Sequence, residues 1–355
     1  MADDDPTRRL PPADRMLTLD SGPMKIAHVR ERNAPAGAPW RLAAALDADG
    51  TTWLDLEEAR RALVAADARR AHNSPLFRQP VTTLDDHLAQ GLRVEALADL
   101  LGAADRTDDD ARLDAADLQF GPPVIHPPSL RDFYAFEQHI ATMWKRRGGE
   151  VPEAWYRLPI FYFSNVSEIR GPGEPVWAPK GSNELDYELE IAALIDTPVR
   201  DVSASQGEQA IGGYMIFNDW SARDLQREET TVRLGPAKGK DFATSIGPWL
   251  VTPDELTDAK QANAYDLAMT ATVNGQETTR GTWATSQFSF GQMIERASGD
   301  VRLRPGDLVG SGTVGTGCLL EIRDQTIGRY LQPGDEVTVS VERLGSMTTP
   351  IVARR

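Results

Sequence analysis

Cysteine is almost absent from this chain, which has one, Cys318, in 355 residues. A single cysteine excludes an internal disulfide framework and leaves no cysteine-rich zinc site. Long apolar runs are missing too, since no stretch reaches the roughly 18 residues that span a bilayer. The N-terminal M-A-D-D-D-P-T-R-R is also too polar for a signal peptide. These absences predict a cytoplasmic protein.

Positive charge is also scarce, because the chain has 38 basic residues and 53 acidic residues, which give a formal net charge of -15. Nucleic acids and anionic membranes bind basic surfaces, so neither is expected as a partner. The glycine-rich stretch 310–317, G-S-G-T-V-G-T-G, lacks the G-K-[ST] of a P-loop. Tight turns that line a cavity are expected there.

Composition divides the chain into parts. Residues 1–23 are rich in Asp, Arg and Pro and are predicted to form a disordered tail. Short strands and an amphipathic helix indicate a small N-terminal domain at 24–119, and the proline-dense F-G-P-P-V-I-H-P-P, residues 120–128, indicates a linker. A larger domain follows at 129–345, with a C-terminal strand or tail at 346–355. Because strands dominate the larger domain, we predict a β-rich α+β fold.

Acidic residues alternate with apolar ones on one predicted strand, so Asp186, Glu188 and Glu190 share a face. A second apolar run, residues 213–217, ends just before Asp219. If the two strands pair, Glu188, Glu190 and Asp219 surround one point. Clustered carboxylate oxygens suit a hard divalent ion such as Mg²⁺ or Ca²⁺. The alternative is a solvated acidic face beside an unrelated turn.

Upstream of these strands, a helix is predicted to begin at Ser129, with Asp132 close to a capping box. At helical spacing Asp132, Phe136 and His139 share one face. Of the five histidines, His139 is the one with candidate polar groups beside it. A structural role for His139 and a capping role for Asp132 are the alternatives.

Four motifs occur in a recognisable order: D-F-Y-x-x-x-x-H, L-D-x-E-L-E, F-N-D-W-S-A-R-D-L-Q and G-P-x-x-G-K-x-F-x-T. In this order they resemble the fumarylacetoacetate hydrolase family, over about Met24 to Arg343. The resemblance implies a mixed β-sandwich roll with short helices, preceded by a small N-terminal domain and assembled as a homodimer.

The same resemblance assigns site residues. It implies metal ligands at Asp132, Glu188, Glu190 and Asp219, with Thr244 as a neighbouring contact. The ion expected is Mg²⁺, and Ca²⁺ or Mn²⁺ also fits. It implies His139 and Lys240 as catalytic residues. It implies substrate contacts from Tyr134, Tyr162, Arg223, Gln226 and either Arg146 or Arg147, of which we choose Arg146.

One expected group is missing from the pattern, the carboxylate that pairs with His139. The S-G-T-V-G-T-G-C loop, where one branch of the family has a glutamate, contains none. Another branch has a glutamate three residues after the histidine, where this chain has Thr142. Glu137, beside the histidine, and Glu150 or Glu153, in a loop expected to act as a lid, are the candidate replacements.

The implied function is a metal-dependent hydrolase that cleaves a C–C bond in a β-diketone-like 2-oxo acid, similar to fumarylacetoacetate or an acylpyruvate, through a metal-held enolate. A decarboxylase, hydratase or enol–keto isomerase of aromatic catabolism on the same scaffold is the first alternative. A non-catalytic metal-binding paralogue is the second, because the acid partner of the histidine is missing.

Overall fold

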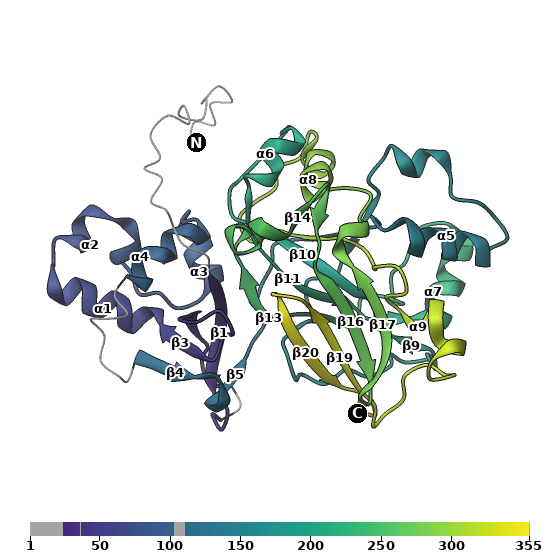
Figure 1. Cartoon of the computed structure of the whole chain (residues 1–355), viewed down its shortest axis with the longest axis horizontal. Coiled ribbons are helices and arrows are strands. Elements are labelled where there is room, and N and C mark those ends of the chain that lie inside the picture. Colours follow the sequence, from purple (N-terminus) through teal and green to yellow (C-terminus); the bar gives the residue numbers. More distant parts are fainter. Residues whose placement is uncertain (1–23, 36, 103–110, 355) are drawn as a thin grey trace, which may run out of the picture.

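The structure is a computed structural model and describes residues 24–35, 37–102 and 111–354. The predicted disordered tail, residues 1–23, lies outside these ranges. Figure 1 shows two parts side by side, the N-terminal strands and helices at the left and a larger, strand-rich part at the right. The predicted α+β class is confirmed.

A twelve-stranded mixed sheet runs through both parts. Strand β1 (Lys25–Glu31) pairs with β2 (Arg41–Ala45) on one side and with β13 (Thr244–Val251) on the other. The N-terminal strands therefore continue the sheet of the larger part, and the boundary placed at 120–128 stays a prediction. The other strands are β3 (Thr52–Asp55), β4 (Arg112–Asp114), β5 (Leu118–Phe120), β6 (Leu130–Phe133), β7 (Phe161–Ser164), β8 (Ile169–Arg170), β10 (Leu189–Ile195), β11 (Ile211–Asp219) and β18 (Leu308–Gly310).

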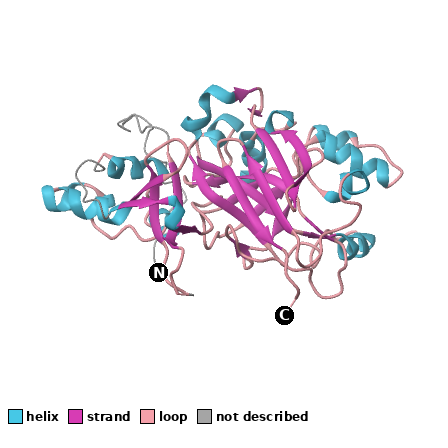
Figure 2. Ribbon diagram, turned by 60° about the horizontal axis from the view of Figure 1, so that its bottom comes forward, coloured by secondary structure: helices cyan, strands magenta, loops and turns pink. Residues whose placement is uncertain are grey.

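The order along this sheet is β4-β3-β2-β1-β13-β11-β10-β18-β6-β7, with β5 paired to β1 and β8 to β13. A smaller sheet, in the order β17-β16-β19-β20, lies across its middle (Figures 1 and 2). Its strands are β16 (Ala268–Val273), β17 (Gln276–Thr282), β19 (Glu336–Val341) and β20 (Gly345–Pro350). Two short pairs complete the set: β9 (Leu185–Asp186) with β12 (Ser221–Ala222), and β14 (Lys260–Gln261) with β15 (Ala264–Tyr265).

Strand alternation builds a core on each face of the large sheet. Met269 and Val273 of β16 point inward and share one apolar core with Ile191 of β10. The next residue along β10, Ala192, faces the other way and packs in a second core with Leu84 of the N-terminal part. The central strands are therefore buried on both sides, which holds the residues at their ends in fixed positions.

Nine α-helices lie in the described ranges, all of them short. None of them is long and apolar enough to cross a membrane. Helices α5, α7 and α9 gather at one end of the larger part (Figure 1), where the cavity described below lies. The helices are α1 (Leu56–Ala66), α2 (Arg70–Asn73), α3 (Leu84–Ala89), α4 (Ala98–Leu101), α5 (Glu137–Arg146), α6 (Ala204–Glu208), α7 (Arg223–Glu229), α8 (Phe290–Ser298) and α9 (Leu319–Ile322).

The prediction that a helix begins at Ser129 is wrong. Residues 130–133 form strand β6, which pairs in parallel with β18, and α5 begins only at Glu137. The Ser129 hydroxyl donates a hydrogen bond to Asp307 Oδ1 at 2.7 Å instead of capping a helix. Asp132 therefore projects from a strand, and His139 from the helix that follows it.

Candidate active site

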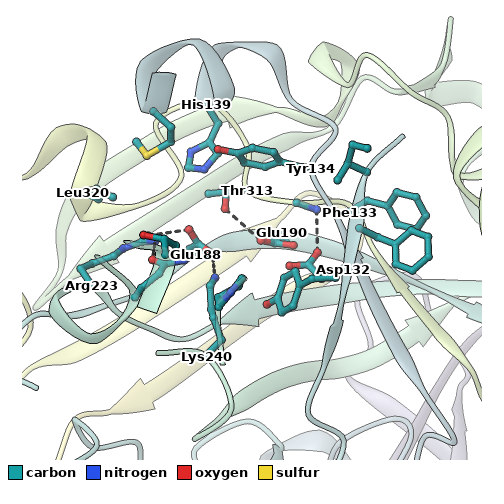
Figure 3. Close-up of a pocket in the computed structure, with 18 of the residues that line it drawn as sticks. Asp132, Phe133, Tyr134, His139, Glu188, Glu190, Arg223, Lys240, Thr313 and Leu320 are labelled. Atoms are coloured by element: carbon teal, nitrogen blue, oxygen red, sulfur yellow. Dashed lines mark hydrogen bonds and ion pairs between the residues drawn. The ribbon is translucent and has the colours of Figure 1, made fainter. Parts of the chain in front are cut away.

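A cavity of about 300 Å³ lies between the ends of the central strands and helices α5, α7 and α9. Figure 3 shows His139 and Tyr134 on one side of it, and the carboxylates of Glu188, Glu190 and Asp132 on the other. The lining residues are Asp132, Phe133, Tyr134, His139, Met143, Arg147, Ile160, Phe161, Tyr162, Glu188, Glu190, Arg223, Gln226, Thr230, Pro236, Lys240, Gly312, Thr313 and Leu320.

Three buried carboxylates from three strands meet at one point. Asp132 comes from β6, Glu190 from β10 and Asp219 from the end of β11, and their oxygens lie within 4.8 Å of one another. Gly310 faces Asp132 across the β6–β18 ladder, and a Cβ there would come 2.5 Å from Asp132 Oδ1. The glycine therefore gives this carboxylate room to enter the cluster. The backbone N–H of Gly312 donates to the same oxygen at 3.2 Å.

Two buried cations lie beside the cluster and hold Glu188. Arg223 donates to Glu188 Oε1 at 2.7 Å, and Lys240 pairs with Glu188 Oε2. Lys240 also donates to Asp219 Oδ2, as does the Tyr162 hydroxyl. Glu188 is thus paired with cations, whereas Asp132 and Glu190 form no ion pair with any described residue.

The pKa values follow this division. Burial raises the pKa of Asp132 and that of Glu190 well above their ordinary values, and the neighbouring carboxylates raise both further. Burial would also raise the pKa of Glu188, but Arg223 and Lys240 outweigh it and hold that pKa below its ordinary value. The cluster is therefore short of positive charge.

A divalent cation fits this cluster. Among the described residues, Glu190 Oε2 and Asp219 Oδ1 are buried without a hydrogen-bond partner. Such acceptors are costly unless a cation or donor meets them. Oxygen ligands alone suit Mg²⁺, Ca²⁺ or Mn²⁺ better than softer ions. The predicted ligands Asp132, Glu190 and Asp219 thus lie together, with Glu188 beside them.

Metal addition should therefore stabilise the fold. We expect Mg²⁺, Mn²⁺ or Ca²⁺ to raise the melting temperature and EDTA to lower it, because an ion at about 100 times its Kd adds about 2.7 kcal/mol. Differential scanning calorimetry measures the shift. An Asp219→Asn variant is the control and should respond less. A melting temperature insensitive to all three ions would remove the metal assignment.

The acid partner of His139 is Glu321, which the sequence did not indicate. His139 Nδ1 lies 3.0 Å from Glu321 Oε2, and both side chains are buried. Tyr134 packs edge-on against the imidazole, with ring centroids 5.4 Å apart. The candidates Glu137, Glu150 and Glu153 are absent from the residues that line the described cavity. Glu137 instead accepts a hydrogen bond from the exposed Tyr156.

Asp186 positions the helix that carries Glu321. The predicted continuous strand breaks between β9 and β10, and Asp186 and Glu188 both accept hydrogen bonds from Arg223. The Asp186 carboxylate accepts the backbone N–H groups of Leu319 and Leu320, the first residues of α9, at 2.8 and 2.9 Å. It also accepts a hydrogen bond from Arg223 at 2.8 Å. One buried arginine thus connects the acid–base pair to the carboxylate cluster.

Comparison with known proteins agrees with this geometry. Residues 129–352 match the model of the fumarylacetoacetate (FAA) hydrolase C-terminal domain. The chain belongs to the fumarylacetoacetate hydrolase family. The family resemblance drawn from the four motifs is thereby confirmed.

Individual relatives of this family carry different names. A 2,4-didehydro-3-deoxy-L-rhamnonate hydrolase of Sphingomonas sp. (strain SKA58) is 35% identical over 191 residues, which are 53% of this chain and 63% of that protein. The match therefore spans less than two thirds of that relative. The structure of a 5-carboxymethyl-2-hydroxymuconate delta-isomerase from Mycobacterium smegmatis is 27% identical, with a TM-score of 0.54 over 68% of this chain and 83% of that one.

A third family member supports the fold over nearly the whole chain. The fumarylacetoacetate hydrolase of the psychrophilic Exiguobacterium antarcticum is 23% identical and superposes with a TM-score of 0.66. The superposition covers 93% of this chain and 100% of that one. The N-terminal part is therefore shared with that structure as well.

Four of the five substrate-contacting residues implied by the family line the described cavity. Tyr134, Tyr162, Arg223 and Gln226 line the cavity, and Gln226 accepts a hydrogen bond from Arg223 at 3.0 Å. Arg146 is not among the residues that line the described cavity, and its guanidinium donates to the backbone carbonyl of Glu321 at 3.2 Å, so its substrate contact stays a prediction. Arg147, the C-cap residue of α5, lines the cavity.

Thr244, the implied neighbouring contact to the ion, lies directly behind the cluster. It is buried and pairs with Asp219 across the β11–β13 ladder. It is not among the described residues that line the cavity. Its contact with an ion stays a prediction.

Proposed function

We propose that this protein is a metal-dependent hydrolase that cleaves a C–C bond in a β-diketone-like 2-oxo acid. One observation supports it above the others: His139, with Glu321 3.0 Å from its Nδ1, faces the carboxylates of Asp132, Glu188 and Glu190 across a single cavity. A base and a cation site on opposite walls can act on two neighbouring carbonyl groups of one substrate.

The residues have separate roles in this proposal. With Nδ1 of His139 next to Glu321, Nε2 is left to accept the proton of an attacking water molecule. The Glu321 carboxylate lies 3.0 Å from Nδ1 and stabilises the protonated form of the imidazole by its charge. Burial would lower the pKa of Lys240, but Asp219 and Glu188 raise it, so its ammonium group stays charged and stabilises the negative charge of an enolate leaving group.

The cation would be held by Asp132, Glu190 and Asp219, with Glu188 alongside. When bound, it supplies Lewis-acid polarisation of the substrate's adjacent oxygens. Arg147, at the C-terminal end of α5, and the apolar side chains of Phe133 and Phe161 also line the cavity. A small organic acid fits this lining, because Arg147 can pair with its carboxylate and the two phenylalanines can contact an apolar segment.

An isomerase or decarboxylase of a 2-oxo acid is the second candidate, because the hydrolase and isomerase relatives share this fold. The two outcomes differ in the number of products, since only hydrolysis yields two carbon fragments. The predicted homodimer and the preference for Mg²⁺ remain part of the proposal.

A substrate screen tests the proposal. We expect the protein with Mg²⁺ to convert at least one acylpyruvate to two acids, and to lose that activity in EDTA. Mass spectrometry of the products, with oxaloacetate and hydroxy-dienoates as further substrates, separates hydrolysis from decarboxylation and isomerisation. A single product with the same mass as the substrate would contradict the hydrolase proposal and support an isomerase.

A further inference from the structure

A second group of potential metal ligands lies beside the carboxylate cluster and differs from it in chemistry. His139, Cys318 and Glu321 each place one ligand atom within 4.8 Å of the others. All three side chains are buried, at 3%, 0% and 7% exposure. The group combines a nitrogen, a sulfur and an oxygen, whereas the first cluster offers oxygen alone.

The distances match those around one tetrahedral ion. With Zn–N and Zn–O bonds of about 2.1 Å and a Zn–S bond of about 2.3 Å, neighbouring nitrogen and oxygen ligands lie about 3.4 Å apart, and sulfur and oxygen about 3.6 Å. Here His139 Nδ1 lies 3.0 Å from Glu321 Oε2, and Cys318 Sγ lies 3.6 Å from the same oxygen. The imidazole nitrogen and Cys318 Sγ lie within 4.8 Å of each other, so binding requires these two side chains to close in on one ion.

The His139–Glu321 contact has a further property. Within the described part of the chain, Nδ1 of His139 is buried and has no partner that meets hydrogen-bond geometry, although Glu321 Oε2 is 3.0 Å away. The two atoms are close without being aimed at each other. Two ligands directed at one ion have this arrangement, because their lone pairs converge on a third point.

We propose that His139, Cys318 and Glu321 form a second metal site that takes a thiophilic divalent ion, Zn²⁺, and that the ion switches off turnover. A thiolate with an imidazole favours zinc, while hard ions prefer the oxygen cluster. A bound ion occupies the imidazole nitrogen and neutralises the carboxylate, so His139 loses its basicity. The binding stands on this geometry alone, whereas the loss of turnover rests on the proposed function.

The ion can reach the site from the cavity. His139 and Leu320 line the cavity, and Cys318 and Glu321 are close neighbours of Leu320 in the chain, at the N-cap and in the first turn of α9. Three protein ligands leave a fourth position, which water fills in open zinc sites. Zinc binding releases the thiol proton, because the coordinating form of cysteine is the thiolate.

Cobalt spectroscopy tests the site directly. Co²⁺ takes the place of Zn²⁺ and shows a sulfur-to-cobalt charge-transfer band in the near ultraviolet when a thiolate binds it. Cys318 is the single cysteine of the chain, so any such band comes from this residue. With the oxygen cluster saturated by Mg²⁺, we expect the wild-type protein to show the band and Zn²⁺ to abolish it.

Two variants and one assay complete the experiment. Cys318→Ser should lose the band and bind Zn²⁺ at least about tenfold more weakly by calorimetry, the lower bound for loss of even an outer-shell partner. Asp132→Asn, in the oxygen cluster, should keep the band. No band in the wild-type protein, or equal zinc affinity in wild type and Cys318→Ser, overturns the site. If the wild-type protein shows the cobalt band but converts no substrate even without zinc, the second metal site is supported and the proposed function is contradicted.

Discussion

Replacing Glu321 by glutamine should lower kcat by about 10²- to 10⁴-fold, the range that a positioned general base contributes. The glutamine keeps the size of the side chain but removes the charge that stabilises the protonated form of His139. Because the substrate is held by other groups, KM should stay near its wild-type value, and the loss should appear in kcat. Steady-state kinetics on the substrate found by the screen measures both constants.

Matched glutamates provide the controls for this prediction. Glu137→Gln, Glu150→Gln and Glu153→Gln remove carboxylates that the sequence offered as partners of His139, whereas the described carboxylate that lies within 4.0 Å of a His139 nitrogen is that of Glu321. We expect each to keep kcat close to wild type. We expect His139→Gln to lower kcat as much as Glu321→Gln does. The double variant should lower kcat little further, because the effects of replacing two residues that act as a unit are not additive. A large loss in Glu150→Gln or Glu153→Gln with a small one in Glu321→Gln would contradict the pair.

The same variants separate an enzyme from a metal-binding paralogue. If His139→Gln keeps the metal-induced rise in melting temperature but loses turnover, the base and the ion are separate parts of one catalytic site. Binding without turnover in the wild-type protein as well would favour the paralogue.

The clustering of Glu188, Glu190 and Asp219 could be predicted because it depends largely on local patterns. Strand alternation places Glu188 and Glu190 two residues apart, and the apolar run before Asp219 indicates a buried strand that ends at a carboxylate. The β10–β11 ladder then joins these residues with a register that pairs Leu189 with Asn218. Local patterns thus placed Glu188, Glu190 and Asp219 near one another, whereas Asp132 was added by the family resemblance.

Glu321 could not be predicted in the same way. It lies 182 positions after His139, on a helix whose first backbone N–H groups are bound by Asp186, so a long-range contact brings it to the imidazole. Its signal in the sequence was a carboxylate three residues after Cys318, just beyond the glycine-rich stretch. The error at Asp132 has a similar origin, because a local capping pattern was overridden by long-range pairing of β6 with β18.

Replacing Lys240 by methionine should destabilise the metal-free protein by about 3 kcal/mol, the cost of leaving a buried charge without its partner. Lys240 is buried and meets both Asp219 and Glu188. Arg223 still pairs with Glu188 in the variant, but Asp219 keeps only the Tyr162 hydroxyl. Chemical denaturation in EDTA measures the loss of the free energy of unfolding.

Divalent metal should restore most of that loss, which makes the stability of the variant depend on the ion more steeply than that of wild type. An ion at about 1,000 times its Kd contributes about 4.1 kcal/mol, enough to offset the missing lysine. Lys238→Met is the matched control in the same loop. Lys238 is exposed and pairs with Asp241 at the surface, so its loss should change stability by less than about 0.5 kcal/mol. If Lys240→Met unfolds in EDTA at the same denaturant concentration as wild type, the carboxylate cluster does not need a cation, and the charge argument for the metal site fails with it.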